Sequence, residues 1–299
     1  MDERPLRLGN IVYSNCFPVH ARLIDRGAPE GIALVDGVPS HLNGLLERGE
    51  IDVSPSSSIE YARNADRYRV LPDLVIGSRG PVRSIQFLST RPPSALGAGT
   101  TVAMPTASAT SVVLLKILLR VRWGASPGFR WFDQAREDPF AGGADAALFI
   151  GDVALRNGLY PHVPHRFDLG AEWWDQTGLP FAFAVWQAAG GTDDQLGRLH
   201  AELVASRAYG RENRAELAAR YAEHFGFARE FLDRYWADLS FELDAPMIEG
   251  LRAFYRHAAE IGEIARAPEI RWVAPTPGST STGGEDGGGE NSMGGESSS

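Results

Sequence analysis

The sequence has one cysteine, one lysine and few long runs of apolar residues. A single cysteine, Cys16, excludes an intramolecular disulfide and a metal cluster built from cysteines. Because Lys116 is the only lysine, a Schiff-base mechanism would have to use it. The apolar stretch Val112 to Leu119 is interrupted by Lys116 and is too short to span a bilayer, and the first residues lack the apolar stretch of a signal peptide. We therefore expect a cytoplasmic protein without a membrane partner.

Basic charge is also scarce, with 29 Lys and Arg against 38 Asp and Glu and a formal net charge of -9. An acidic chain argues against sequence-independent binding of nucleic acid, which needs clustered basic residues. The glycine-rich sequence motifs of nucleotide-binding loops are missing as well. The seven histidines show no metal-ligand spacing, since His162 and His165 lie in a proline-rich segment typical of a surface loop. We expect no metal site.

Hydrophobic residues make up 43% of the 299 residues, which is enough for a substantial core. Short apolar segments alternate with helical patterns, and this alternation predicts an α/β fold with largely parallel sheets. We expect strands at 6–13, 51–54, 68–76, 84–89, 101–104, 129–132, 146–150, 165–169 and 181–188. Helices are expected at 18–25, 38–48 (capped by Ser40 and stopped by Gly49), 57–64, 109–123, 152–157, 193–224 with a break near Gly210, 228–239 and 245–261.

This pattern predicts two α/β lobes with a ligand cleft between them. The first lobe is expected to comprise residues 1–89 and 183–273, and the second residues 90–182. Residues 274–299 are rich in Gly and Ser, cannot bury apolar surface, and are expected to form a disordered tail.

Two junctions between a strand and a helix are rich in hydroxyl side chains. They are Ser54-Pro55-Ser56-Ser57-Ser58 and Thr106-Ala107-Ser108-Ala109-Thr110-Ser111. Free N–H groups and the positive end of the helix dipole make such a position suitable for a carboxylate, and hydroxyls add neutral donors. Ordinary N-capping explains either junction alone, but two of them in similar positions of facing lobes favour an anion site equally well.

Three further positions lie where strands end or lobes meet. Asn15 follows the first strand, at the carboxyl end where open α/β sheets bind ligands, although a turn asparagine is the simpler explanation. Ser84 lies near a predicted lobe crossing, where an ordinary exposed strand serine is the simpler explanation. Gly151-Asp152 follows the strand 146–150, and there an N-capping Asp152 is the simpler explanation. Cys16 has no partner pattern for a nucleophile and is expected to be a buried thiol.

Taken in order, these motifs resemble one known family. The resemblance rests on Asn15-Cys16-Phe17-Pro18, Ile51-Asp52-Val53-Ser54-Pro55-Ser56-Ser57-Ser58, Gly80-Pro81-Val82 with Ser84, Ser108-Ala109-Thr110-Ser111, Leu148-Phe149-Ile150-Gly151-Asp152 and Thr177-Gly178-Leu179-Pro180-Phe181. It covers about residues 6 to 270, and the serine-rich stretches are its most distinctive part. The chain resembles chorismate dehydratase, the first enzyme of the futalosine route to menaquinone. Cys16-Phe17 departs from some members of that family.

The resemblance implies a periplasmic-binding-protein-like fold of type II and dehydration of chorismate to 3-[(1-carboxyvinyl)oxy]benzoate and water, with no cofactor. Chorismate is a dianion. Ser56 and Ser57 are expected to hold one carboxylate, and Ser108, Thr110 and Ser111 the other. Asn15 and Ser84 match catalytic positions, and Gly151 and Asp152 match substrate-binding positions.

Two alternative functions remain open at this point. The first is the related two-lobe dihydroxynaphthoate synthase, which is expected to use a histidine base; no histidine here falls in a matched cleft motif. The second is a non-enzymatic carboxylate-binding protein, which normally carries a secretion signal or lipid anchor. The sequence makes no prediction of oligomeric state.

Overall fold

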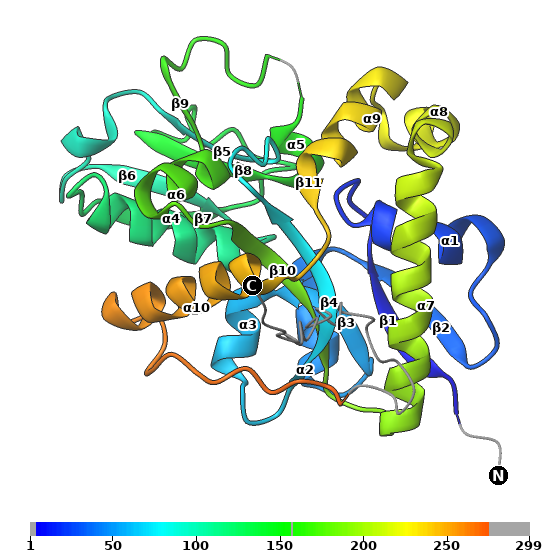
Figure 1. The fold of residues 1–299 in the computed structure, drawn as a ribbon. Coiled ribbons are helices and arrows are strands. Elements are labelled where there is room, and N and C mark those ends of the chain that lie inside the picture. The colour runs from blue at the N-terminus through cyan, green and yellow to red at the C-terminus, as the bar shows by residue number, and fades with distance from the viewer. Residues whose placement is uncertain (1–3, 157, 275–299) are drawn as a thin grey trace, which may run out of the picture.

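The computed structural model describes residues 4–156 and 158–274, so almost all of the expected tail lies outside the described residues. Helices and strands alternate along the first two thirds of the chain, and helices dominate the last third (Figure 1). The strands are β1 (Leu6–Ile11), β2 (Ile32–Gly37), β3 (Val53–Ser57), β4 (Arg69–Ser78), β5 (Ile85–Ser89), β6 (Thr101–Pro105), β7 (Gly128–Phe132), β8 (Ala146–Ile150), β9 (His165–Asp168), β10 (Phe181–Ala188) and β11 (Leu239–Ser240). The helices are α1 (Phe17–Arg26), α2 (Pro39–Glu47), α3 (Ser58–Arg63), α4 (Thr110–Val121), α5 (Gly151–Ala154), α6 (Leu169–Thr177), α7 (Asp193–Glu212), α8 (Arg214–Phe225), α9 (Arg229–Asp238) and α10 (Ala245–Glu260), with a 3-10 turn at Pro93–Ala95.

The strands form two sheets, which define two lobes. The first lobe has the strand order β11-β4-β10-β3-β1-β2, and the second has the order β7-β6-β8-β5-β9. Both sheets are mixed, so the expectation of largely parallel sheets was wrong. Strands β4 and β10 run between the lobes in opposite directions, and β10 pairs antiparallel with both β3 and β4. The chain leaves the first lobe after β4 and returns to it through β10, so these two neighbouring strands run in opposite directions.

The first crossing between the sheets comes earlier than the expected lobe boundary at residue 89. Strand β4 ends in the first sheet at Ser78, whereas β5 pairs with β8 and β9 in the second sheet from Ile85 onward. The chain returns at β10, where Phe181 already pairs with Ser78. The expected strand at 84–89 therefore exists, but it belongs to the second lobe.

Local predictions were mostly right about the type of element and less so about its ends. Strand β2 and helix α6 were not predicted. Ser40 does not cap α2, which begins with Pro39 after Val38, whereas Gly49 follows its end in the left-handed conformation. The long helix breaks at Asn213 rather than Gly210. Gly210 instead lets α7 approach α1, because a Cβ there would lie 2.1 Å from the Pro18 carbonyl oxygen.

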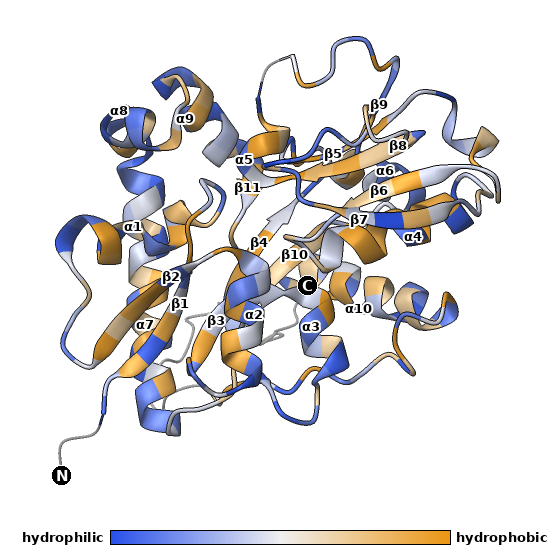
Figure 2. Ribbon diagram, turned by 180° about the vertical axis from the view of Figure 1, so that it is seen from behind, coloured by the Kyte–Doolittle hydropathy of each residue, from blue (hydrophilic) through white to orange (hydrophobic). Residues whose placement is uncertain are grey.

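In Figure 2, strands such as β6 and β8 carry orange, apolar stretches, whereas the surrounding helices alternate between blue and orange. Strand β10 is buried along its whole length, as its continuous apolar sequence predicts. Helix α10 packs on β10 and also contacts α4 of the second lobe. No helix among the described residues is long and apolar enough to cross a membrane.

Candidate functional site

A small cavity lies between the two sheets: the space open to a water-sized molecule is about 50 Å³, and the volume reaches about 490 Å³ only when the gaps between atoms and the solvent at its mouth are counted. Its walls come from both lobes. The polar or small residues that line it are Tyr13, Asn15, Ser57, Ser84, Ser108, Ser111, Gly151 and Ala184, and the others are Ile11, Pro39, Ile76, Ile85, Ile150 and Phe183. These residues include hydroxyl and amide groups but no charged side chain. The cavity therefore offers neutral hydrogen-bond partners between apolar walls, a composition typical of small-molecule sites.

Most of the site residues predicted from sequence meet in this cavity. Asn15 comes from the turn between β1 and α1, Ser57 from the end of β3, and Ser84 from the crossing segment before β5. The second lobe contributes Ser108 and Ser111 at the start of α4, and Gly151 at the start of α5. Three other predicted binding residues, Ser56, Thr110 and Asp152, do not line it.

Asn15 and Ser84 both line the cavity. The Oδ1 atom of Asn15 is buried and has no hydrogen-bond partner among the described residues. Ser84 is buried, and its carbonyl oxygen accepts a hydrogen bond of 2.8 Å from the Gly151 N–H, which joins the crossing segment to α5. The buried hydroxyl of Tyr235 lies near Ser84 without a hydrogen bond of ordinary geometry. The Ser84 hydroxyl makes one long hydrogen bond, donating to the Val82 carbonyl oxygen at 3.5 Å. Asn15 Oδ1, and Ser84 Oγ as an acceptor, therefore remain available to a ligand.

The serines at the start of α4 bind each other rather than capping the helix in the ordinary way. The N-cap residue is Ala109, which has no side-chain hydrogen bond. Ser108 Oγ donates to Ser111 Oγ at 3.1 Å and accepts from the Ser111 N–H at 3.4 Å. At the other junction the N-cap residue Ser57 makes no capping hydrogen bond either. The N-capping explanation thus fails at Ser57, and it is met only weakly, through the 3.4 Å contact, at Ser108.

Ser56 and Thr110, which were predicted to bind the carboxylates, point away from the cavity for reasons that the structure shows. Strand β3 continues to Ser57, so successive side chains point to opposite faces and Ser56 faces away from Ser57. Ser56 is fully buried, and its Oγ has no partner among the described residues. Thr110 Oγ1 accepts a hydrogen bond of 3.2 Å from the Ile59 N–H in α3. It therefore joins the two lobes instead of facing the cavity.

Asp152 also joins the lobes. Its Oδ1 atom accepts a hydrogen bond of 2.5 Å from the Ser14 hydroxyl, and its carboxylate accepts another from the Ser14 N–H. Burial raises the pKa of Asp152, and the two bonds from Ser14 act in the opposite direction. It does not cap α5, whose N-cap residue is Ile150.

Several residues of the cavity were not predicted. Tyr13 lies against Gly151, whose φ is +61° and whose added Cβ would lie 3.0 Å from the Tyr13 ring. Ile11 and Ile150 are the last residues of β1 and β8, and Phe183 is on β10. The rule that ligands bind beyond the carboxyl ends of strands could have found the first three. Nothing in the sequence of β10, which is apolar except for Gln187, distinguishes Phe183.

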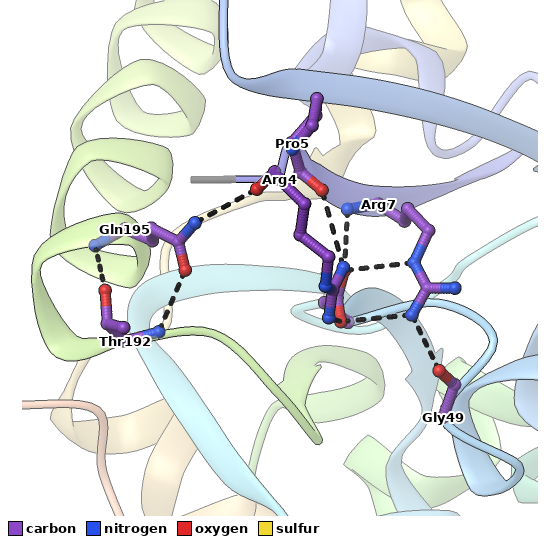
Figure 3. Close-up of polar contacts among 7 residues, drawn as sticks. Arg4, Pro5, Arg7, Gly49, Thr192 and Gln195 are labelled. Carbon is purple, nitrogen blue, oxygen red and sulfur yellow. Dashed lines mark hydrogen bonds and ion pairs between the residues drawn. The ribbon is translucent and has the colours of Figure 1, made fainter. Parts of the chain in front are cut away.

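Asp52, in the most distinctive motif, does not line the cavity. Its carboxylate accepts hydrogen bonds from Arg4 at 2.7 and 2.8 Å and from the Arg7 N–H at 2.9 Å. Figure 3 shows Arg4 and Arg7 side by side, with Arg7 also bonded to Gly49 and with Gln195 bonded to the Arg4 carbonyl. Burial alone would raise the pKa of Asp52, but the hydrogen bonds from both arginines outweigh it and hold this pKa below its usual range. This residue stabilises the start of β3 rather than the site.

The remaining candidates for chemistry lie outside the cavity. Burial raises the pKa of the Cys16 thiol to about 12, consistent with the expected buried thiol. His20 is fully buried, its pKa is lowered by burial to about 3, and its Nε2 accepts from Trp186 at 3.2 Å. Its Nδ1 pairs with Asn10 Oδ1 at 2.8 Å. Within residues 4–156 and 158–274, acidic, histidine and cysteine side chains form no cluster that could hold a metal ion.

Comparison with known proteins identifies the family of the chain. The family model described as menaquinone biosynthesis matches residues 6–260. Chorismate dehydratase of Thermus thermophilus is 33% identical over 266 residues, which cover 84% of this chain and 94% of that protein. The chain belongs to the chorismate dehydratase family. A second member, chorismate dehydratase of Campylobacter jejuni, is 33% identical over 181 residues, covering 59% of this chain and 64% of that protein.

This member of the chorismate dehydratase family has the fold of periplasmic binding proteins, as expected. The Escherichia coli periplasmic aliphatic sulphonate binding protein superposes with a TM-score of 0.63 at 16% identity, covering 97% of this chain and 99% of that one. A crystal structure of an Archaeoglobus fulgidus protein gives a TM-score of 0.69 at 18% identity, covering 88% of this chain and all of that one. At these identities the likeness extends to the fold alone.

Proposed function

We propose that this protein is a lyase that dehydrates chorismate to 3-[(1-carboxyvinyl)oxy]benzoate and water in menaquinone biosynthesis. The single observation that carries the proposal is the cavity between the lobes. In a chain related to chorismate dehydratases along most of its length, hydroxyl side chains of both lobes line one cavity together with apolar side chains. The cytoplasmic location expected from the sequence stays a prediction.

Chorismate is a dianion with one carboxylate on the ring and one on the enolpyruvyl group. Ser57 stands on the first lobe and Ser108 and Ser111 stand on the second, so the cavity can offer donors to two separated carboxylates. Neutral donors inside apolar walls interact strongly with an anion because water is largely excluded. Because one lobe lies on each side of the cavity, a ligand in it can be held by closure of the two lobes.

The reaction itself needs stabilised charge and an assisted leaving group. The C3 proton is vinylogous to the ring carboxylate, so removing it spreads charge into that carboxylate as an extended enolate. The electron pair left at C3 then forms the C3–C4 double bond, and the C4–O bond breaks with loss of hydroxide. The ring becomes aromatic, which provides the driving force. The protein has to stabilise the charge that develops in the transition state.

No carboxylate or histidine of the described residues lines the cavity to act as the base. We therefore assign proton removal to the substrate's own enolpyruvyl carboxylate. The proton then leaves with hydroxide as water, so the reaction balances without a co-reactant. Asn15 would orient that carboxylate, and Ser84 would donate a hydrogen bond to the departing hydroxyl. The missing histidine disfavours the related synthase that is expected to use a histidine base.

The test is to incubate the purified protein with chorismate and to follow the loss of diene absorbance, with the product identified by mass and proton NMR. We expect the aromatic ether and water, and we expect Asn15→Ala and Ser84→Ala to lose most turnover. Ser126→Ala, an exposed serine outside the cavity, is the matched control and should keep it. Chorismate that is bound but unchanged would favour a carboxylate-binding protein instead. Full turnover in both Asn15→Ala and Ser84→Ala would contradict their assigned roles.

A further inference from the structure

The turn that carries Asn15 is held from the opposite lobe by one carboxylate. Asp152, in α5 of the second lobe, accepts a hydrogen bond from the Ser14 hydroxyl at 2.5 Å. The Ser14 N–H donates to the same carboxylate at 3.2 Å to Oδ1 and 3.3 Å to Oδ2. Ser14 precedes Asn15 in the turn between β1 and α1 of the first lobe. The contact therefore spans the lobes one residue away from a predicted catalytic side chain.

Ser14 is fixed on its other side as well. It is fully buried, and its carbonyl oxygen accepts a hydrogen bond of 2.8 Å from Trp236 Nε1 in α9. Figure 1 shows that α9 lies close to α5 at the end of the molecule where β1 leads into α1. With its N–H, hydroxyl and carbonyl all engaged, Ser14 has little freedom. The position of Asn15 depends on the same contacts.

Direct binding of substrate by Asp152, expected from the sequence, is the competing explanation. Its carboxylate does not line the cavity and is occupied by Ser14 in this structure. A carboxylate near a dianionic ligand would also repel it. The charges of Arg156 and His224 act to lower the pKa of Asp152. The charge of Asp152 in turn contributes to the raised pKa of Tyr13 and Tyr235, after the larger effect of their burial.

We propose that Asp152 is a positioning residue, which ties the Ser14–Asn15 turn to the second lobe and so sets the place of the Asn15 amide at the cavity. The proposal rests on the proposed function, because its effect is read out through chorismate turnover. It assigns to Asp152 an action on the reaction that passes through Ser14 and Asn15 and requires no contact with substrate.

The first experiment compares Asp152→Ala with Asp152→Asn. The amide oxygen of asparagine can still accept a hydrogen bond from the Ser14 hydroxyl, whereas alanine cannot. We expect Asp152→Ala to lower kcat about ten- to a hundredfold, the range in which a small misplacement of a reacting group acts. Asp152→Asn should retain most of kcat, and KM should change less than kcat in both. Asp175→Ala, which removes an exposed carboxylate of α6, is the matched control and should be unchanged.

The second experiment separates positioning from a general loss of structure. If Asp152 acts through Asn15, adding Asp152→Ala to Asn15→Ala should lower kcat no further, because the positioned amide is already missing. Two losses that multiply in the double variant would overturn the proposal. So would an Asp152→Ala variant with the kcat of the wild type.

Ser14→Ala keeps the proposal testable should Asp152→Ala fail to fold. It removes only the hydroxyl bond and leaves the N–H bond and Asp152 in place, so we expect a smaller fall in kcat that is also absent in the Asn15→Ala background. An unchanged kcat in Ser14→Ala would then overturn the proposal. If the wild type leaves chorismate intact, the proposed function fails and this inference with it. If the wild type converts chorismate and Asp152→Ala matches it, the inference alone fails.

Discussion

Ser56 and Ser57 are adjacent on β3, yet only Ser57 lines the cavity between the lobes. The alternation of side chains along a strand separates them, so a motif of consecutive serines supplies one group to the site and one to the other face of the sheet. Ser54 is two residues before Ser56, on the same face, and its Oγ likewise has no hydrogen-bond partner among the described residues. A Cβ at Gly9 would lie 2.5 Å from that Oγ, which shows how closely β1 approaches β3 there.

This arrangement predicts different effects for two similar substitutions. Ser57→Ala should raise the KM for chorismate about ten- to a hundredfold, because a hydrogen bond to a charged group is worth about 1.5–3 kcal/mol. Ser56→Ala should leave KM near the wild-type value, since Ser56 does not line the cavity and its hydroxyl has no partner within residues 4–156 and 158–274. Steady-state kinetics of both variants checks this. Equal increases in KM would mean that both serines reach the substrate, as the sequence alone suggested.

A glycine is expected to be required at position 151 for two reasons: its backbone is left-handed, and the Tyr13 ring lies where a Cβ would be. Gly151→Ala should lower the free energy of unfolding by about 1–2 kcal/mol, the cost of a left-handed residue with a Cβ. It should also raise KM, because the new Cβ would displace the Tyr13 ring at the cavity. Gly226→Ala is the matched control, with φ of +71° and no atom near its added Cβ. Urea unfolding and kinetics separate the two effects, and a raised KM in both variants would contradict this account.

Asp52 should make the free energy of unfolding depend on pH in the acidic range. Hydrogen bonds from Arg4 and Arg7 hold its folded-state pKa below the unfolded value, so its contribution is complete above about pH 4 and is lost as the pH falls toward the folded pKa. Asp52→Asn should therefore be less stable than the wild type at pH 7, with a difference that shrinks below pH 4. Urea unfolding from pH 7 to pH 2.5 measures it. A difference that stays constant over this range would show that the charge of Asp52 contributes nothing.

The fold class could be predicted from the sequence because strand and helix patterns alternate clearly, as at β6 followed by α4. Whether neighbouring strands are parallel or antiparallel could not be predicted, since this depends on where the chain crosses between the lobes. The crossing over residues 79–84 carries no local signal beyond Gly80 and Pro81. Helix α6 was missed although Asp168 caps it by accepting from the N–H groups of Gly170 and Ala171.

The lining of the cavity was predicted better at strand ends than within motifs. Asn15 and Gly151 were expected there because open α/β sheets bind ligands beyond the carboxyl ends of their strands, and both line the cavity. Thr110 and Asp152 were misplaced because their partners, Ile59 and Ser14, are 51 and 138 residues away and belong to the other lobe. Contacts between lobes of this kind leave no periodic pattern in the sequence.

The most direct test of the central claim is a crystal structure of the Asn15→Ala variant, in which turnover should be slow, with chorismate bound. We predict the diene between the two sheets, with one carboxylate within about 3 Å of the Ser57 hydroxyl and the other within the same distance of Ser108 or Ser111. Chorismate bound outside this cavity, or held there with neither carboxylate near these serines, would contradict the account.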